Sequence, residues 1–308
     1  MGEFSFIKWI RERQKRHKDV IVGIGDDCAV IDVSSDRFCL ITTDMMVEGT
    51  HFDLKKCTIR DVGRKAIACN ISDVAAMGCK ATVAIVSVCF PDHTPEKFAR
   101  ELYKGIWDIA DKYNIEIAGG DIISGHGPLC INVALLGKDE GLKPVCRSGA
   151  KVGDMILVTG TLGGSLLGKH LHFDPRVKEG ILLNRHFTIH AMIDISDGLT
   201  ADLNHILEES HKGAILYEEK IPVSKAAEEM AKKTGNTPLH HALFDGEDYE
   251  LVVVLSKKQA KKVTESNLFP ENTFSCIGEI VGGSGIKMKH PNGALKHIKP
   301  HGYEHLRS

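Results

Sequence analysis

Apolar positions along this chain occur either in continuous runs or at a spacing near 3.6 residues, and the two patterns together predict a mixture of strands and helices. Runs rich in β-branched residues predict strands, and in the first half these are 37–44, 81–90, 115–121 and 129–138. Apolar residues near a 3.6 spacing predict a helix over 59–78, which ends at Gly78. A second helix is predicted over 94–113, with Thr94 as its cap and Pro95 at its first position.

The second half continues the mixture after a segment rich in Gly, Lys and Pro. Apolar runs there predict strands at 155–160, 191–196, 214–219, 249–256 and 274–281. Helical periodicity predicts helices at 164–171, 177–186, 198–210, 224–235 and 257–266. We place a domain boundary within 147–153, which gives domains 1–148 and 149–308. Because strands and helices do not alternate strictly, we expect an α+β fold in both halves.

Length and composition exclude several classes of protein. A chain of 308 residues with 43% hydrophobic residues is long and apolar enough for two globular domains. The formal net charge of −2 offers no basic surplus for nucleic acid, and the basic stretch 11–18 fits the wet face of an N-terminal helix. No apolar run reaches the ~18 residues of a membrane helix, and the N-terminus lacks the apolar core of a signal peptide. We therefore expect neither a nucleic-acid partner nor a membrane.

The cysteine and histidine patterns indicate free thiols and no zinc site. Nine cysteines are an odd number, none forms Cys-x-x-Cys, and most lie in apolar runs. This usage predicts buried free thiols and a cytoplasmic location. His186 and His190 have zinc-ligand spacing, but no third ligand with suitable spacing accompanies them.

The stretch "VIVGIGDDCAVIDV" places Asp26 and Asp27 side by side in a glycine turn within an apolar run. Taken alone, it is either a solvated turn or a cation site. The same pattern, an apolar run followed by small residues and then a carboxylate, occurs six times, at Asp26/Asp27, Asp44, Asp73, Asp121, Asp194/Asp197 and Asp245/Glu247/Asp248. Small residues allow close approach to a ligand, and scattered carboxylates suit Mg²⁺ shared with phosphates. The set therefore predicts phosphoryl transfer, in which positioning and charge neutralisation dominate.

One segment imitates a phosphate-binding loop. "GGSLLGKH" (163–170) matches Gly-x4-Gly-Lys, but His170 stands where a Ser or Thr should hold Mg²⁺. The kinase signatures His-Arg-Asp and Asp-Phe-Gly are also absent. We therefore expect a nucleotide site of another kind.

The motifs in their order resemble the thiamine-monophosphate kinase family over nearly the whole chain. The matching segments read "GEFSFI", "GIGDDCAV", "TTDMMVEGTHF", "KAIACNISDVAAMG", "AGGD", "RSGAKVGDMILVTG", "MIDISDGLTADLNHI", "GEDYEL" and "GYEHL". The resemblance implies the two-domain fold shared with aminoimidazole-ribonucleotide synthetase, with N-terminal halves that pair into a shared β-barrel in a homodimer. It also implies conversion of thiamine monophosphate to thiamine diphosphate by direct in-line transfer from ATP, assisted by several Mg²⁺ ions.

The resemblance also assigns roles to individual residues. It implies metal ligation by Asp27, Thr42, Thr43, Asp44, Asp73, Asp121, Asp194 and Asp197. It implies ATP contacts from Gly120, Asp121, Arg147 and Ser196, and central roles in catalysis for Asp44, Asp73 and Arg147. His51 and Glu247 would face the thiamine phosphate, and Asp26 would cap or orient its loop. Arg suits charge neutralisation because its planar fork is always protonated.

Three departures from the family pattern bear on the substrate. Pro300 occupies the substrate-facing position where the family often has a Trp against the thiamine ring. Ile122 and Ile123 stand where the family commonly has two Thr, and Asp245 adds a carboxylate that is either a solvated neighbour or a ligand to the thiazolium. The alternatives are a related ATP-dependent enzyme acting on another phosphate or carbonyl substrate, or a nucleotide-binding protein without turnover.

Overall fold

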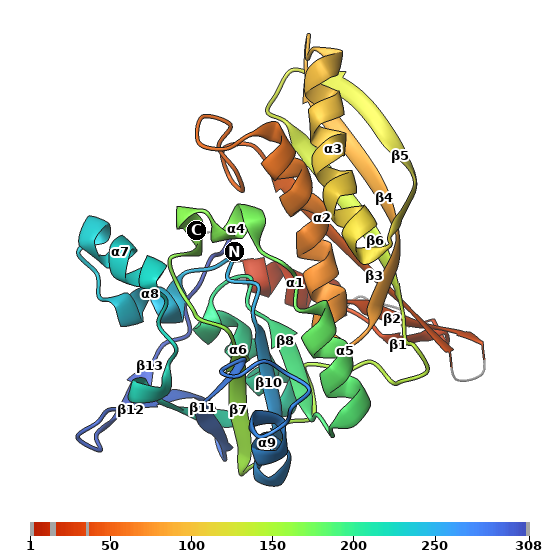
Figure 1. The fold of residues 1–308 in the computed structure, drawn as a ribbon. Coiled ribbons are helices and arrows are strands. Elements are labelled where there is room, and N and C mark those ends of the chain that lie inside the picture. The colour runs from red at the N-terminus through yellow and green to blue at the C-terminus, as the bar shows by residue number, and fades with distance from the viewer. Residues whose placement is uncertain (1–2, 13–16, 35–36, 306–308) are drawn as a thin grey trace.

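Two β-sheets with flanking helices make up the protein, as the computed structural model shows (Figure 1). The structure describes residues 3–12, 17–34 and 37–305. The mixed α+β class agrees with the sequence prediction, whereas the domain limits 1–148 and 149–308 remain a prediction. None of the helices in the described ranges is long and apolar enough to cross a membrane.

The first half forms a six-stranded sheet in the order β1-β2-β3-β6-β4-β5. Its strands are β1 Val20–Val22, β2 Ala29–Ser34, β3 Arg37–Val47, β4 Lys80–Pro91, β5 Glu116–Gly125 and β6 Cys130–Lys138. Strand β5 runs parallel to β4, and the other neighbours are antiparallel. Helices α2 (Ile59–Ala76) and α3 (Glu96–Tyr113) cover one face (Figure 1). Within the described residues the sheet is open, with β1 and β5 as its edges.

The second half forms a seven-stranded sheet in the order β13-β12-β9-β11-β7-β10-β8. Its strands are β7 Asp154–Thr159, β8 Ala191–Asp194, β9 Gly213–Tyr217, β10 Leu251–Ser256, β11 Phe274–Val281, β12 Gly285–Lys289 and β13 Leu295–Ile298. Around it lie the helices η1 Ser165–Leu167, α4 Lys169–His172, α5 Val177–His186, α6 Leu199–Ser210, η2 Glu218–Lys220, α7 Lys225–Thr234, α8 Pro238–Phe244 and α9 Lys257–Thr264.

Helix α2 joins the two halves and therefore positions the site. It packs on β3 and α3 in its own half and on α4, α5 and β8 in the other half. Because it is covered on nearly every side, even its polar residues Lys65, Asn70 and Ser72 are buried. The Ser72 hydroxyl donates to Asp194 Oδ2 at 2.5 Å, so a side chain of α2 contacts the end of β8 directly.

Most predicted elements are present, and the differences have local causes. Helix α2 stops before Gly78, whose φ of 67° favours glycine. The predicted cap of α3 is wrong: Pro95 is itself the N-cap, and the Thr94 hydroxyl bonds to Pro91 O at 2.6 Å. The short helix α8 and the hairpin β12–β13 were not predicted, because their apolar patterns are too short to show a period.

The N-terminal and cysteine predictions were met in part. Helix α1 spans Glu3–Glu12, while residues 13–16 of the basic stretch lie outside the described residues. All nine cysteines are free, but only Cys28, Cys69 and Cys79 are fully buried.

Candidate active site

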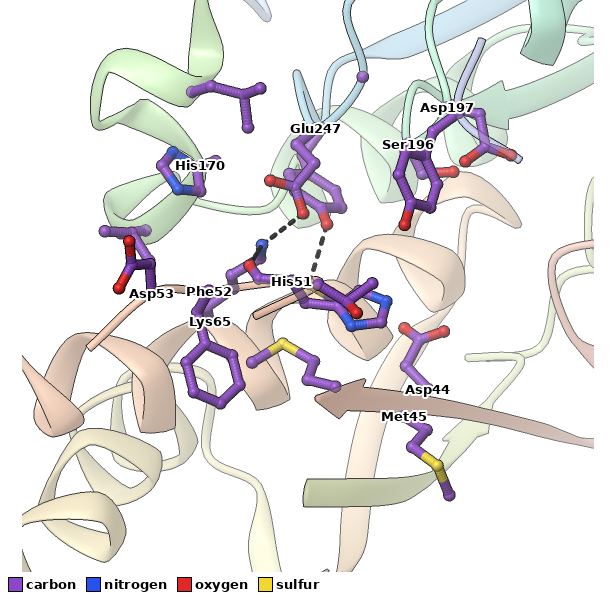
Figure 2. Close-up of a pocket in the computed structure, with 18 of the residues that line it drawn as sticks. Asp44, Met45, His51, Phe52, Asp53, Lys65, His170, Ser196, Asp197 and Glu247 are labelled. Carbon is purple, nitrogen blue, oxygen red and sulfur yellow. Dashed lines mark hydrogen bonds and ion pairs between the residues drawn. The ribbon is translucent and has the colours of Figure 1, made fainter. Parts of the chain in front are cut away.

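A cavity of about 940 Å³ lies where the two halves meet (Figure 2). Its walls come from the end of β3, the following loop, α2, the η1–α4 segment, the loops after β8 and α8, and the C-terminal tail. Seven of the predicted site residues line it, namely Thr43, Asp44, His51, Asp73, Ser196, Asp197 and Glu247. These residues come from segments as far apart as β3 and the 245–250 loop, so the tertiary fold brings together what the sequence scatters.

A cluster of carboxylates adjoins the cavity through Asp73, which lines it, while Asp27 and Asp194 are buried behind. Oxygen atoms of Asp27, Asp73 and Asp194 all lie within 4.8 Å of one another. The Thr42 hydroxyl donates to Asp73 Oδ2 at 2.6 Å, so Thr42 contacts this cluster rather than the open cavity. Asp27 Oδ2 is buried and has no hydrogen-bond partner among the described residues. A buried, unpaired carboxylate oxygen is costly, and a cation would satisfy it.

Burial and mutual repulsion make this cluster hard to ionise. Burial raises the pKa of Asp44 to about 6 and, with the charge of Asp27, that of Asp194 to about 7. The pKa of Asp73 is raised well above its usual range by burial and by the charges of Asp44, Asp194 and Asp27. Burial also raises the pKa of Asp197 to about 6. A hard dication would reverse these shifts, so oxygen donors in this arrangement fit Mg²⁺.

Arg147 neutralises part of the cluster from outside the cavity. Its guanidinium Nη2 lies 2.7 Å from Asp27 Oδ1, while its Nε is buried without a partner in the described residues. The backbone N–H of Arg147 donates to the Asp26 carboxylate at 3.1 Å, and Asp27 N donates to the same carboxylate. The prediction that Asp26 orients the loop is therefore confirmed, and its carboxylate also holds the segment that carries Arg147.

His51, Glu247 and two aromatic residues of the C-terminal tail line the other side of the cavity. The backbone N–H of Val47 donates to His51 Nδ1 at 3.0 Å, which places the proton of the neutral ring on Nε2. Burial and the neighbouring His305 and Lys65 lower the pKa of His51, so the neutral form is favoured. The ring of His305 lies 5.1 Å from His51 and 4.7 Å from Tyr303 between centroids.

The C-terminal tail brings aromatic residues to the cavity close to Pro300 in the sequence. Pro300 does not line the cavity, whereas Tyr303 and His305 do. Aromatic side chains therefore line the cavity three and five residues after Pro300. Both residues belong to the motif "GYEHL", but the sequence alone did not show that this tail lies against the cavity. That arrangement is held in part by two hydrogen bonds between the chain ends, from Glu3 N to Glu304 Oε1 and from His305 N to Glu3 Oε2.

Two predicted residues lie away from the cavity in the single chain. Gly120 and Asp121 belong to β5, an exposed edge strand. Asp44 on β3 is in register with Gly120 on β5, and strands β6 and β4 lie between them. Three strand spacings therefore separate the two residues, which is roughly 14 Å. One chain therefore does not bring Asp121 to the carboxylate cluster.

The segment that imitates a phosphate loop is occupied by the protein itself. The Gly163 N–H donates to Asp248 Oδ2 at 2.8 Å, and the Gly164 N–H donates to Asp245 Oδ2 at 3.2 Å. These backbone donors would have to be free to cradle a phosphate, so the rejection of a phosphate loop is confirmed. Asp245 also lies 3.0 Å from His241 Nδ1, so it is a structural clamp rather than a solvated neighbour or a ligand in the cavity.

Comparison with known proteins identifies the family. A model of the AIR synthase related protein N-terminal domain matches residues 25–138, and one of the C-terminal domain matches residues 162–291. A thiamine-monophosphate kinase of Rhodopirellula baltica is 40% identical, over 98% of this chain and 97% of its own. The chain belongs to the thiamine-monophosphate kinase family.

Solved structures of the family agree with this assignment. The structure "AaThiL complexed with AMPPCP and TMP" is 31% identical to this chain, covers 99% of it and 97% of its own chain, and has a TM-score of 0.85. A thiamine-monophosphate kinase from Stenotrophomonas maltophilia is 30% identical, covers 98% of both chains and has a TM-score of 0.72. The family resemblance inferred from the motifs is thereby confirmed, and so is the two-domain architecture.

Proposed function

We propose that this protein transfers the γ-phosphoryl group of ATP to thiamine monophosphate and forms thiamine diphosphate. The observation that carries the proposal is the shared cavity, in which the acidic motifs of both halves meet the His51 and Glu247 side in a chain of this family. A relative of the same fold has been solved with AMPPCP and TMP, a nucleotide and a second ligand together. A complex that holds both ligands suits direct transfer between two bound substrates.

The chemistry asks for charge neutralisation rather than proton transfer. The acceptor is a phosphate oxygen that is already anionic near neutral pH, so a general base is not required. The difficulty is to bring two phosphate anions together and in line. His51 would donate from Nε2 to an anionic group of the acceptor, and Glu247 would face its cationic ring. Direct in-line transfer needs no phosphorylated side chain.

We propose that Mg²⁺ is held by the carboxylate cluster. Asp27, Asp73 and Asp194 would form its centre, and the unpaired Asp27 Oδ2 supports this assignment. Thr42, Thr43, Asp44 and Asp197 adjoin the cluster or the cavity and remain our further candidates. When bound, Mg²⁺ supplies neutralisation of phosphate charge. Arg147 and Ser196 remain the proposed ATP contacts, and Arg147 would leave its Asp27 partner as the nucleotide arrives.

We also propose a homodimer in the reducing cytoplasm. The six-stranded sheet leaves one face without helices, and Met45, Ile85 and Ile123 are 60%, 43% and 56% exposed on it. Such an apolar face suits a second copy, with the two faces closing into the shared barrel expected from the family. Gly120 and Asp121 lie on this edge, so pairing would place them beside a second chain. The nine free cysteines are compatible with a reducing compartment.

A turnover assay with thiamine monophosphate and labelled ATP, with the diphosphate product resolved, tests the proposal. We expect labelled thiamine diphosphate that depends on Mg²⁺. The absence of product from folded, nucleotide-binding protein would contradict the proposal. A thermal-shift measurement separates the alternatives: thiamine monophosphate should add stability beyond an ATP analogue with Mg²⁺, whereas a binding protein without turnover would respond to nucleotide alone.

A further inference from the structure

Lys65 of α2 is buried at the point where the two halves of the protein meet. Its side chain is 1% exposed, although it forms part of the cavity wall. The ammonium donates to the backbone carbonyl of His51 at 2.8 Å and forms an ion pair with the Glu247 carboxylate. Figure 2 shows Lys65 between the His51 segment and Glu247, with a dashed line to the carboxylate. A buried lysine is costly unless it is paired, so both contacts are needed to keep it there.

The two acceptors of Lys65 belong to the two segments that face the acceptor substrate. His51 lies in the connection between β3 and α2, and Glu247 lies in the connection between α8 and β10. These segments are 196 residues apart in the chain, and each comes from a different half. One ammonium group therefore fixes the relative position of the two sides of the acceptor site.

Glu247 needs such support because its backbone is strained. Its φ is 64°, which is unfavourable for a residue other than glycine. Its N–H donates to Ser196 O at 2.7 Å, and the Ser165 hydroxyl donates to its carbonyl at 2.6 Å. These bonds hold the backbone, whereas Lys65 holds the carboxylate. A strained backbone that is held in this way indicates that the Glu247 carboxylate is positioned before the substrate binds.

We propose that Lys65 is a positioning residue that sets the acceptor-substrate site by holding Glu247 and the His51 segment together. The proposal rests on the proposed function and adds to it the residue that makes the site selective for a cationic ring joined to a phosphate. With Lys65 in place, the Glu247 carboxylate is held at a fixed position and can face the ring. Without Lys65, the carboxylate would lose its ion-pair partner and turn toward water.

The test compares Lys65→Met with Lys169→Met by steady-state kinetics. Lys169 is the matched control, because it also pairs with a buried carboxylate, Glu250, at 2.7 Å but does not line the cavity. For Lys65→Met we expect KM for thiamine monophosphate to rise about tenfold or more, and KM for ATP to change less than about twofold. Lys169→Met should leave both values unchanged. Equal changes in the two KM values, or none in a folded variant, would overturn the proposal.

A comparison of a double variant with Glu247→Gln covers the case in which Lys65→Met does not fold. Lys65→Met/Glu247→Gln removes both buried charges and so avoids an unpaired carboxylate. We expect its KM for thiamine monophosphate to equal that of Glu247→Gln alone, because Lys65 acts through Glu247. A further rise over Glu247→Gln would contradict this. Wild-type turnover is measured first: if wild type does not phosphorylate thiamine monophosphate, the proposed function itself fails, whereas unchanged kinetics in the variants overturns only the role of Lys65.

Discussion

The guanidinium of Arg147 lies 2.7 Å from Asp27 Oδ1, so a cation of the chain already occupies one side of the carboxylate cluster. This ion pair links Arg147, the proposed nucleotide contact, to Asp27, a proposed metal ligand. Replacing Arg147 with Gln should lower the free energy of unfolding by about 2 kcal/mol or more, because Asp27 is left as an unpaired buried charge. Asp27→Asn in the same background should recover part of the loss. Urea unfolding of wild type and the two variants checks this, and equal stability of Arg147→Gln and wild type would contradict it.

Asp44→Asn and Asp73→Asn should abolish turnover while leaving the fold intact. Both residues line the cavity. Asp73 belongs to the cluster and Asp44 is close enough to repel it, so removing one charge should not lower the melting temperature in the absence of metal. We expect kcat to fall about 10²-fold or more, as for the loss of a group that stabilises developing charge. Asp108→Asn is the control, because Asp108 pairs with Arg60 outside the cavity. Near-normal rates in both cluster variants at ordinary Mg²⁺ would refute the metal assignment.

The stability of the metal-free protein should fall as the pH rises. Asp44, Asp194 and Asp197 have folded pKa values of about 6, 7 and 6, above the ordinary value of 3.8. A carboxyl group whose pKa is raised by folding binds its proton more tightly in the folded state, so its contribution is full below pH 4 and is lost by about pH 7. Thermal melts in chelator from pH 5 to 8 should show the decline. Mg²⁺ should raise the melting temperature most at the high end, and a flat response to both would contradict the cluster's role.

The tail residue Tyr303 should contribute to acceptor binding through its ring. Tyr303→Ala should raise KM for thiamine monophosphate about three- to tenfold, the range expected for loss of one aromatic contact. Tyr303→Phe should be close to wild type, because the ring is kept. Trp107→Ala serves as the control, since Trp107 is an exposed aromatic residue of α3 that does not line the cavity. Identical KM values for Tyr303→Ala and Tyr303→Phe would argue against a ring contact.

Ile123→Glu should break the proposed dimer. The side chain lies on the bare face of the six-stranded sheet, where a charge would oppose burial against a second copy. Sedimentation or size-exclusion chromatography should show a monomer, and turnover should fall if Asp121 acts across the interface. Leu295→Glu, at an exposed apolar position on β13 in the other sheet, should remain dimeric and active. A wild-type protein that is monomeric at working concentration would refute the proposal.

Local patterns in the sequence were enough to predict the α+β class, most elements and the acidic motifs. Helix α2, for example, follows from apolar spacing and the stop at Gly78, because both signals act within a few residues. The role of Asp26 came from the family resemblance, and the hydrogen bonds that its carboxylate accepts from the Asp27 and Arg147 backbones agree with it. The predicted cap at Thr94 was wrong because its hydroxyl donates to the carbonyl of Pro91 instead.

Contacts between segments remote in the chain were decided only by the tertiary structure. Periodicity carries no information on which side chains meet across 182 residues, so the Lys65–Glu247 pair could not be seen in the sequence. The same holds for Tyr303 and His305, which reach the cavity because the tail bonds to Thr200 and Asp197 and to Glu3 at the other end of the chain. Asp121 shows the converse, since its motif lies on an exposed edge strand, where the preceding Gly120 is roughly 14 Å from Asp44. Residue type and spacing thus determined which chemistry this chain can perform, while packing across the α2 junction decided which groups stand close enough to perform it.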